Sequence, residues 1–167
     1  MSDIQVEIGS NPPESQPRFC GAVTLKNGEQ ASIQVADQPQ TLDPRTRQLL
    51  AKGMETITGA DVITEQRAIE QMAAGNYHLY YLQNAQGEMI GYATVFPGEN
   101  GSCYINKIQT AMAARGQGIA TSLLEQIMRD FQQVDAINVV EDPELHDAMT
   151  RTYQRLLQKT HSSQNAS

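Results

Sequence analysis

The chain has 167 residues, of which 40% are hydrophobic and 19% charged, and its formal net charge is −7. This composition is typical of one globular domain, and the acidic balance argues against a nucleic-acid partner, which needs a basic surface. The two cysteines have the spacing of neither a disulfide framework nor a metal site, so we expect no metal and a cytoplasmic location. The first ten residues do not resemble a signal peptide, and no apolar run is long enough to span a membrane, so no membrane partner is expected.

Three regions are expected along the chain. Residues 1–18 contain the polar, proline-bearing segment NPPESQP and predict a flexible arm. Residues 19–159 predict a single domain, and residues 160–167 a polar tail. The domain begins with the segment GAVTLKNGEQASIQVA, which predicts two strands joined by a turn at Asn27-Gly28.

Two helices follow this hairpin. Asp43-Pro44 has the residue types of a helix start, a capping aspartate followed by proline at the first helical position. Thr64 predicts the cap of a second helix and Gly75 its end. On this second helix we expect the inward face to carry Ile69, Met72 and Ala73.

Strands and helices alternate in the second half of the domain. The segments YHLYYLQN and MIGYATVF predict a second hairpin, and SCYINKIQT predicts a further strand. From Ala120 the apolar residues recur with helical period, at Ala120, Leu123, Leu124, Ile127, Met128 and Phe131. AINVV then predicts a buried strand. A last helix is expected after Asp142-Pro143, with one apolar face made of Leu145, Met149, Tyr153 and Leu156.

The stretch ARGQGIATSLL, residues 114–124, lies where a strand ends and a helix begins. Glycine disfavours a helix by about 1 kcal/mol, so Gly116 and Gly118 call for an explanation. A helix start presents free N–H groups and the positive end of the helix dipole, and glycine lets a phosphate approach the backbone closely. Arg115 adds a positive charge. A tight turn with a purely structural role is the alternative interpretation.

The motif RGQGIA resembles the phosphate-binding loop of the GNAT superfamily, the acetyl-CoA-dependent N-acyltransferases. Its surroundings, INKIQTAMAARGQGIATSLLEQIM, are similar to the fourth strand, loop and third helix of that family, and the likeness extends over about residues 30–157. The resemblance implies an α/β fold with a mixed, mostly antiparallel central sheet flanked by helices. It also implies that acetyl-CoA is the co-substrate and that an amine attacks its thioester directly.

The resemblance assigns the cofactor contacts by position. The backbone of the fourth strand would pair with the pantetheine arm through Ile108, Gln109 and Thr110. The loop amides would hold the pyrophosphate, and the residues concerned are Arg115, Gly116, Gln117, Gly118, Ile119, Ala120 and Thr121. The strand is expected to diverge from its neighbour, which begins near Ala136, to admit the cofactor.

The resemblance also implies an acid that protonates the leaving thiolate, and Tyr153 stands at that position. Tyr153 also lies on the apolar face of the last helix, so a core residue is the alternative. His146 stands at a further position where the family often contacts the cofactor, with a surface histidine as the alternative.

The general base is left open by the sequence. Simple alternation along the strand would place Tyr104 and Asn106 on one face, with Cys103 and Lys107 on the other. Tyr104, Asn106 or Glu99 in the preceding loop could receive the amine proton through water, or the amine could arrive neutral. For Cys103 a buried strand residue is favoured over a nucleophile, since no partner base is evident.

In the family, two more strands follow the tyrosine, whereas here the sequence reads YQRLLQKTHSSQNAS. We therefore expect another segment to cover the sheet edge that those strands occupy. The candidates are the N-terminal hairpin, 21–36, or a second chain in a homodimer.

Three functional hypotheses follow. The first is an N-acetyltransferase acting on a primary amine of a small molecule or protein. The second is a non-catalytic protein of the same fold that binds acetyl-CoA as a sensor or interaction module. The third is an unrelated α/β protein whose glycine loop binds another phosphate or nothing.

Overall fold

Six strands form one sheet, and their order in the sheet is their order in the chain, β1-β2-β3-β4-β5-β6. In this computed structural model, residues 15–138 and 143–166 are described, without the side chains of 143–146 and 160–166. Neighbouring strands are antiparallel except β5 and β6, which are parallel. The strands are β1 (Arg18–Thr24), β2 (Gln30–Ala36), β3 (His78–Asn84), β4 (Met89–Pro97), β5 (Ser102–Thr110) and β6 (Gln133–Ile137).

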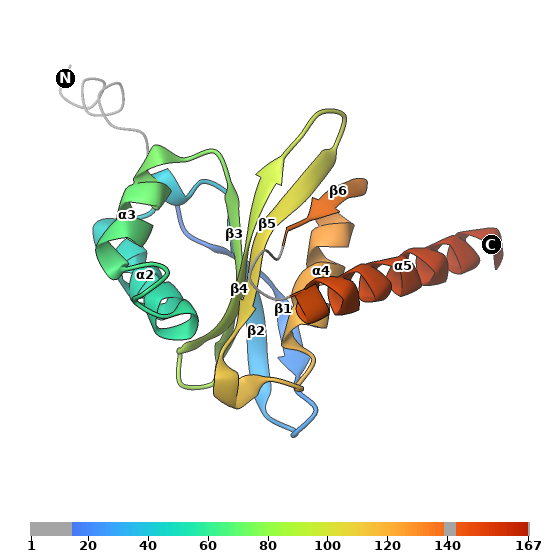
Figure 1. Ribbon diagram of the computed structural model, residues 1–167, viewed down its shortest axis with the longest axis horizontal. Coiled ribbons are helices and arrows are strands. Elements are labelled where there is room, and N and C mark those ends of the chain that lie inside the picture. Colours follow the sequence, from blue (N-terminus) through green and yellow to red (C-terminus); the bar gives the residue numbers. More distant parts are fainter. Residues whose placement is uncertain (1–14, 139–142, 167) are drawn as a thin grey trace, which may run out of the picture.

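Helices cover both faces of this sheet (Figure 1). On one face lie α2 (Pro44–Thr58) and α3 (Glu65–Ala74), and on the other α4 (Ile119–Asp130) and α5 (Pro143–Ala166). Short 3-10 turns, η1 (Pro39–Thr41) and η2 (Met112–Ala114), precede α2 and α4. A separate apolar core fills each side of the sheet. The predicted fold class, a mixed and mostly antiparallel sheet flanked by helices, is confirmed.

The first two helices begin as their residues predict. The side chain of Asp43 accepts a hydrogen bond from the backbone N–H of Thr46 at 3.0 Å, and Thr64 caps α3 through the N–H of Arg67 at 3.1 Å. The expectation that Ala73 points inward is wrong, because it is exposed in the last turn of α3. Ala68, one helical turn before Met72, is buried instead.

The strand β6 also differs from its prediction. It runs over Gln133–Ile137, three residues earlier than AINVV, and Val139 and Val140 lie outside the described residues. Within β6 only Val134 and Ile137 are buried, and they lie three residues apart because the register with β5 shifts between Val134 and Ala136 and leaves Asp135 as an extra residue. The prediction of a buried strand is therefore wrong for the exposed residue Ala136.

The N-terminal hairpin does not cover the edge at β6. β1 pairs with β2 and forms the opposite edge of the sheet, so the proposal that segment 21–36 reaches the β6 side is wrong. Arg18 anchors β1 there: its Nε lies 2.7 Å from Asp37, and its Nη2 lies 3.1 Å from Asp130 at the end of α4. The hydroxyl of Tyr80 donates to the same Asp130 carboxylate at 2.7 Å. These contacts hold the N-terminal hairpin against the helix α4.

The helix α5 extends away from the rest of the molecule in Figure 1 and continues to Ala166, through most of the segment assigned to a polar tail. The domain limits at residues 18 and 159 stay predictions. Met149 is buried, and Tyr153 and Leu156 pack against the core, which agrees with the apolar face predicted for this helix. None of the described helices is both long and apolar enough to cross a membrane.

Candidate active site

Among the described residues, the second half of β5 has a partner strand on one side only. β5 pairs with β6 only as far as Ile105, whose carbonyl accepts from the N–H of Asn138 at 2.8 Å. Beyond this point β5 has no partner strand on that side among the described residues. The N–H of Ala111 donates to Ile90 on β4 at 2.9 Å, so alternation along the strand turns the backbone groups of Thr110 and Ile108 away from β4. Those N–H and C=O groups therefore face the side of β5 that has no partner strand among the described residues.

The glycine loop lies beyond the end of this edge of β5. Gly116 and Gly118 have φ angles of +80° and +88°, which explains glycine at both positions by backbone conformation. Gly118 is the N-cap of α4 and makes no side-chain capping bond. The first intrahelical bond runs from the N–H of Ser122 to the Gly118 carbonyl, at 3.0 Å. The N–H groups of the three residues between them have no intrahelical partner and point out of the helix start.

A cavity of about 310 Å³ lies between this loop and the end of β5. It brings together nine of the ten residues that the sequence predicted for acetyl-CoA: Ile108, Gln109, Thr110, Arg115, Gly116, Gly118, Ile119, Ala120 and Thr121. The close approach of β4 positions the start of α4 beside it. A Cβ atom on Gly91 would stand 2.4 Å from the Cγ2 of Ile119, far inside normal contact.

Gln117, the tenth predicted residue, has a different place. Its side-chain oxygen accepts from the backbone N–H of Asn27 at 2.8 Å, and its carbonyl accepts from Lys26 N–H at 3.4 Å. Gln117 thus ties the β1–β2 turn to the loop. As a result Lys26 lines the cavity, with its Cε 4.0 Å from where a Cβ on Gly118 would be.

The cavity at the loop is positively charged in a chain of net charge −7. Arg115 and Lys26 line it, and neither forms an ion pair with any residue that the structure describes. Two cations without an ion pair among the described residues, beside a helix N-terminus, form a favourable site for phosphate groups. Lys26 was missed by the sequence analysis because it lies 89 residues before Arg115 in the chain.

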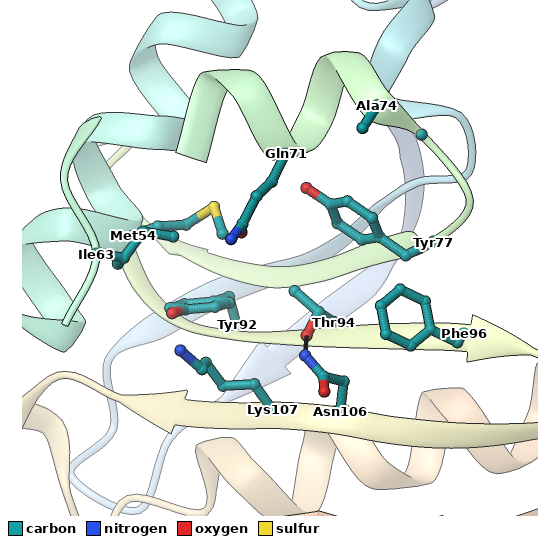
Figure 2. Close-up of a pocket in the computed structure, with 11 residues that line it drawn as sticks. Met54, Ile63, Gln71, Ala74, Tyr77, Tyr92, Thr94, Phe96, Asn106 and Lys107 are labelled. Atoms are coloured by element: carbon teal, nitrogen blue, oxygen red, sulfur yellow. Dashed lines mark hydrogen bonds between the residues drawn. The ribbon is translucent and has the colours of Figure 1, made fainter. Parts of the chain in front are cut away.

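A second cavity, also about 310 Å³, lies on the other face of the sheet, under α2 and α3 (Figure 2). Asn106 and Lys107 of β5 both line it, although they are consecutive residues. The reason is a bulge: Thr94 pairs with Lys107 and Val95 with Ile105, so Asn106 is an extra residue in β5. The expectation that Lys107 shares a face with Cys103 is wrong for this reason.

Aromatic side chains make up much of the wall of this second cavity. Tyr77, Tyr92 and Phe96 all line it, and Tyr77 meets Phe96 edge-on at 6.0 Å between ring centroids. The hydroxyl of Tyr77 is buried and has no hydrogen-bond partner among the described residues. Burial, together with the neighbouring Tyr92, raises the pKa of Tyr77 above its usual value, so the hydroxyl keeps its proton and can donate.

The remaining candidates for catalysis lie outside both cavities. The hydroxyl of Tyr153 accepts from the N–H of Val134 at 3.4 Å, near the start of β6. Glu99 sits in the β4–β5 turn, and Tyr104 packs on Phe96 with its ring 40% exposed. The side chain of His146 lies outside the described residues.

Cys103 is buried in β5, and burial, with a smaller effect of Asp135, raises its pKa to about 12. The buried-residue interpretation of Cys103 is therefore confirmed. Among the described residues, no group of three or more histidine, cysteine, aspartate or glutamate side chains is placed to hold a metal ion.

Residues 46–157 match the model of the acetyltransferase (GNAT) family. The chain belongs to this family. The match confirms the predicted enzyme class, a GNAT-type N-acetyltransferase, and rules out the hypothesis of an unrelated α/β protein. It includes β5, the glycine loop and α4, the elements that form the first cavity.

Solved structures with the same fold include other GNAT N-acetyltransferases. A ribosomal-protein-alanine N-acetyltransferase from Brucella melitensis biovar Abortus 2308 is 15% identical, with a TM-score of 0.54 over 75% of this chain and 90% of that one. The aminoglycoside N-acetyltransferase AAC(6')-Iy, solved with CoA, is 12% identical, with a TM-score of 0.51 over 86% and 88% of the two chains.

An aminoglycoside acetyltransferase from an uncultured soil metagenomic sample, meta-AAC0020, was solved with sisomicin. It is 15% identical, with a TM-score of 0.50 over 73% of this chain and 86% of that one. At these identities the likeness concerns the fold. No curated protein matches the chain in sequence.

Proposed function

We propose that the protein transfers an acetyl group from acetyl-CoA to the primary amine of a small molecule or protein. One observation carries the proposal: the edge of β5 that has no partner strand among the described residues runs from the glycine loop to the bulge at Asn106, which lines the second cavity. A cofactor bound along this edge would have its phosphates at one end and its acyl group at the other. The first cavity would then bind the cofactor, and the second, called the acceptor cavity below, would bind the amine.

The residues of the first cavity suit the phosphates of acetyl-CoA. The free N–H groups at the start of α4 would bind the pyrophosphate, and Gly116 leaves space for it, since a Cβ there would meet nothing within 4 Å. Arg115 and Lys26 would neutralise its charge. The backbone groups of Ile108 and Thr110 are free to pair with the amide groups of the pantetheine arm.

The chain's own contribution to the chemistry is mainly positioning. Acetyl-CoA supplies the thioester, whose acetyl group passes to the amine nitrogen as the carbon–sulfur bond breaks and a carbon–nitrogen bond forms. Of the described residues that line the acceptor cavity, none carries a carboxylate or an imidazole. We therefore propose that the amine reacts in its neutral form. As the carbon–nitrogen bond forms, the nitrogen releases one N–H proton to water. The rate then rises with pH up to the pKa of the amine.

We propose Tyr153 as the acid that protonates the leaving thiolate. Its hydroxyl lies on β6 rather than in either cavity, and this placement favours a second candidate function, a GNAT-fold protein that binds acetyl-CoA without turnover. A homodimer through the edge strand β6 also stays a proposal. It is supported by the single partner, β5, that β6 has among the described residues, and light scattering tests it.

Two measurements on the same protein test the proposed function. Calorimetric titration with acetyl-CoA measures binding, and thiol release across a panel of amines measures transfer. Binding together with amine-dependent thiol release supports the acetyltransferase. Binding with no release above the rate of simple hydrolysis favours the non-catalytic candidate, and no binding contradicts both.

A further inference from the structure

The acceptor cavity has a chemical character of its own, beyond what the transfer reaction requires. Figure 2 shows Gln71 reaching down from α3 and Lys107 reaching up from β5, with Tyr92, Thr94 and Phe96 of β4 between them. Asn106 adds a further polar group, and Met54 and Ile63 add apolar surface. The cavity thus combines a large aromatic surface with a few polar groups, which is the usual composition of a site for a small ligand.

Among the described residues that line the cavity, Lys107 is the only one with a basic side chain, and none has a carboxylate. Lys107 is half-buried, and its ammonium group forms no ion pair and no hydrogen bond within the described part of the chain. Its place in the cavity results from the bulge at Asn106, since regular alternation would turn it to the opposite face. A partly desolvated cation without a partner is stabilised by an anionic group on a ligand.

The same lining argues against a polycationic acceptor. An aminoglycoside brings several ammonium groups, and each is stabilised by a carboxylate in a site built for it. Here the acidic residues are absent from the described lining, and Lys107 would repel the ammonium groups. The negative net charge of the whole chain does not offset this, because charges beyond about 10 Å are largely screened at ordinary salt concentrations.

The polar and apolar groups indicate how the rest of the ligand is held. The side-chain amide of Gln71 offers the ligand both a hydrogen-bond donor and an acceptor. Met54, Tyr92 and Phe96 present apolar surface suited to a side chain of similar kind. A volume of about 310 Å³ lies at the small end of the range for ligand pockets, about 300–1,000 Å³, so the cavity suits a small ligand.

We propose that the acceptor is a small amine that carries a carboxylate on a compact apolar body, as a free apolar or aromatic amino acid does. The carboxylate pairs with Lys107, and the apolar body packs among Met54, Tyr92 and Phe96. This inference rests on the proposed function, because it names the substrate class of the same site. It distinguishes a free amino acid from the amino terminus of a peptide, in which an amide replaces the carboxylate.

Matched substrates test the proposal. L-phenylalanine and L-methionine are each compared with their primary amides and with sisomicin, at saturating acetyl-CoA, by thiol release. Because the amine of an amide loses its proton at lower pH, each kcat/KM is referred to the concentration of neutral amine. In wild type we expect the acid to exceed its amide by roughly tenfold to a hundredfold, the usual effect of a charge-assisted hydrogen bond.

The variant Lys107→Met keeps the length of the side chain and removes its charge. It is expected to reduce the ratio of acid to amide to about one, whereas Lys52→Met, an exposed lysine on α2 outside both cavities, leaves the ratio unchanged. A wild-type ratio near or below one overturns the proposal, and so does a ratio that persists in Lys107→Met. Faster acetylation of sisomicin than of either amino acid overturns it too.

A binding measurement separates this inference from the proposed function. N-acetyl-L-phenylalanine and its amide are titrated into the protein saturated with CoA. Tighter binding of the acid, lost in Lys107→Met, supports the inference even where turnover is too slow to measure. Equal affinities overturn the inference and leave the proposed function standing, whereas absence of CoA binding contradicts the proposed function itself.

Discussion

Replacing Gly91 by alanine is expected to disturb the cofactor site from a strand that does not belong to it. The new Cβ would stand 2.4 Å from the Cγ2 of Ile119, the first residue of α4, and 3.2 Å from the carbonyl oxygen of Gln109. Carbon atoms in contact lie about 3.5–4.0 Å apart, so Ile119 must retreat by roughly 1 Å or more. Ile119 is 1% exposed and branched at Cβ, so its methyl group moves only if the start of α4 moves.

Two effects of this substitution are measurable. Overpacking of a well-filled core costs about 1–3 kcal/mol in the free energy of unfolding, which lowers the melting temperature by roughly 2–10 °C in a domain of this size. A shift of about 1 Å in a binding site can cost as much as ~100-fold in rate, and we expect acetyl-CoA affinity to fall at least ~10-fold. Calorimetry gives the affinity, and a thermal melt gives the stability.

The double variant Gly91→Ala, Ile119→Ala provides the control, because it removes the methyl group that clashes. Its affinity for acetyl-CoA is expected to exceed that of the single Gly91→Ala variant, a non-additive result that only contacting residues give. If Gly91→Ala alone binds acetyl-CoA as wild type does, with an unchanged melting temperature, the close approach of β4 to α4 does not position the loop.

Three further predictions concern individual contacts. Lys26→Met is expected to weaken acetyl-CoA binding about fivefold, since an exposed ion pair contributes up to ~1 kcal/mol, and calorimetry that finds no loss removes Lys26 from the site. If Tyr153 protonates the thiolate, Tyr153→Phe lowers kcat at constant acetyl-CoA affinity; equal turnover leaves it as the residue that packs α5 on β6. Partial burial alone would raise the pKa of Asp37, but hydrogen bonds from Arg18 and His78 lower it below its usual value. The ionised Asp37 therefore stabilises the folded state above pH ~4, and this stabilisation is lost as the pH falls through the lowered pKa. In urea unfolding, the free energy of unfolding of Arg18→Met should decline less in acid than that of wild type.

Local patterns carried most of the information on the fold. Asp43 and Thr64 predicted their helix starts because a cap involves only residues within one turn. The glycine loop was recognisable for the same reason, as its residues are contiguous. The limits of β6 could not be recognised from the sequence, because an edge strand is buried on one face only and its apolar pattern is weak. The sequence AINVV was the more apolar stretch, yet pairing with β5 begins at Gln133.

The features that sequence analysis missed depend on contacts between distant segments. Lys26 reaches the loop only because Gln117 binds the β1–β2 turn, 90 residues away from it. Lys107 reaches the acceptor cavity only because β5 carries one residue more than β4 at Asn106, and a bulge leaves no mark in the alternation of side chains that sequence reasoning uses. The unpartnered hydroxyl of Tyr77 likewise depends on what α3 places around it.

Calorimetric titration of acetyl-CoA into wild type, Gly118→Val and Gly87→Val tests the account most directly. Both glycines have a left-handed backbone, with φ of +88° and +81°, so valine strains both positions alike, but Gly87 lies in the β3–β4 turn away from the cavity. Only at position 118 does the side chain also occupy the space that a phosphate would need. The account predicts binding to wild type and Gly87→Val and loss of binding in Gly118→Val with its fold intact by circular dichroism. Equal affinity in Gly118→Val and wild type would contradict the assignment of the pyrophosphate to this loop.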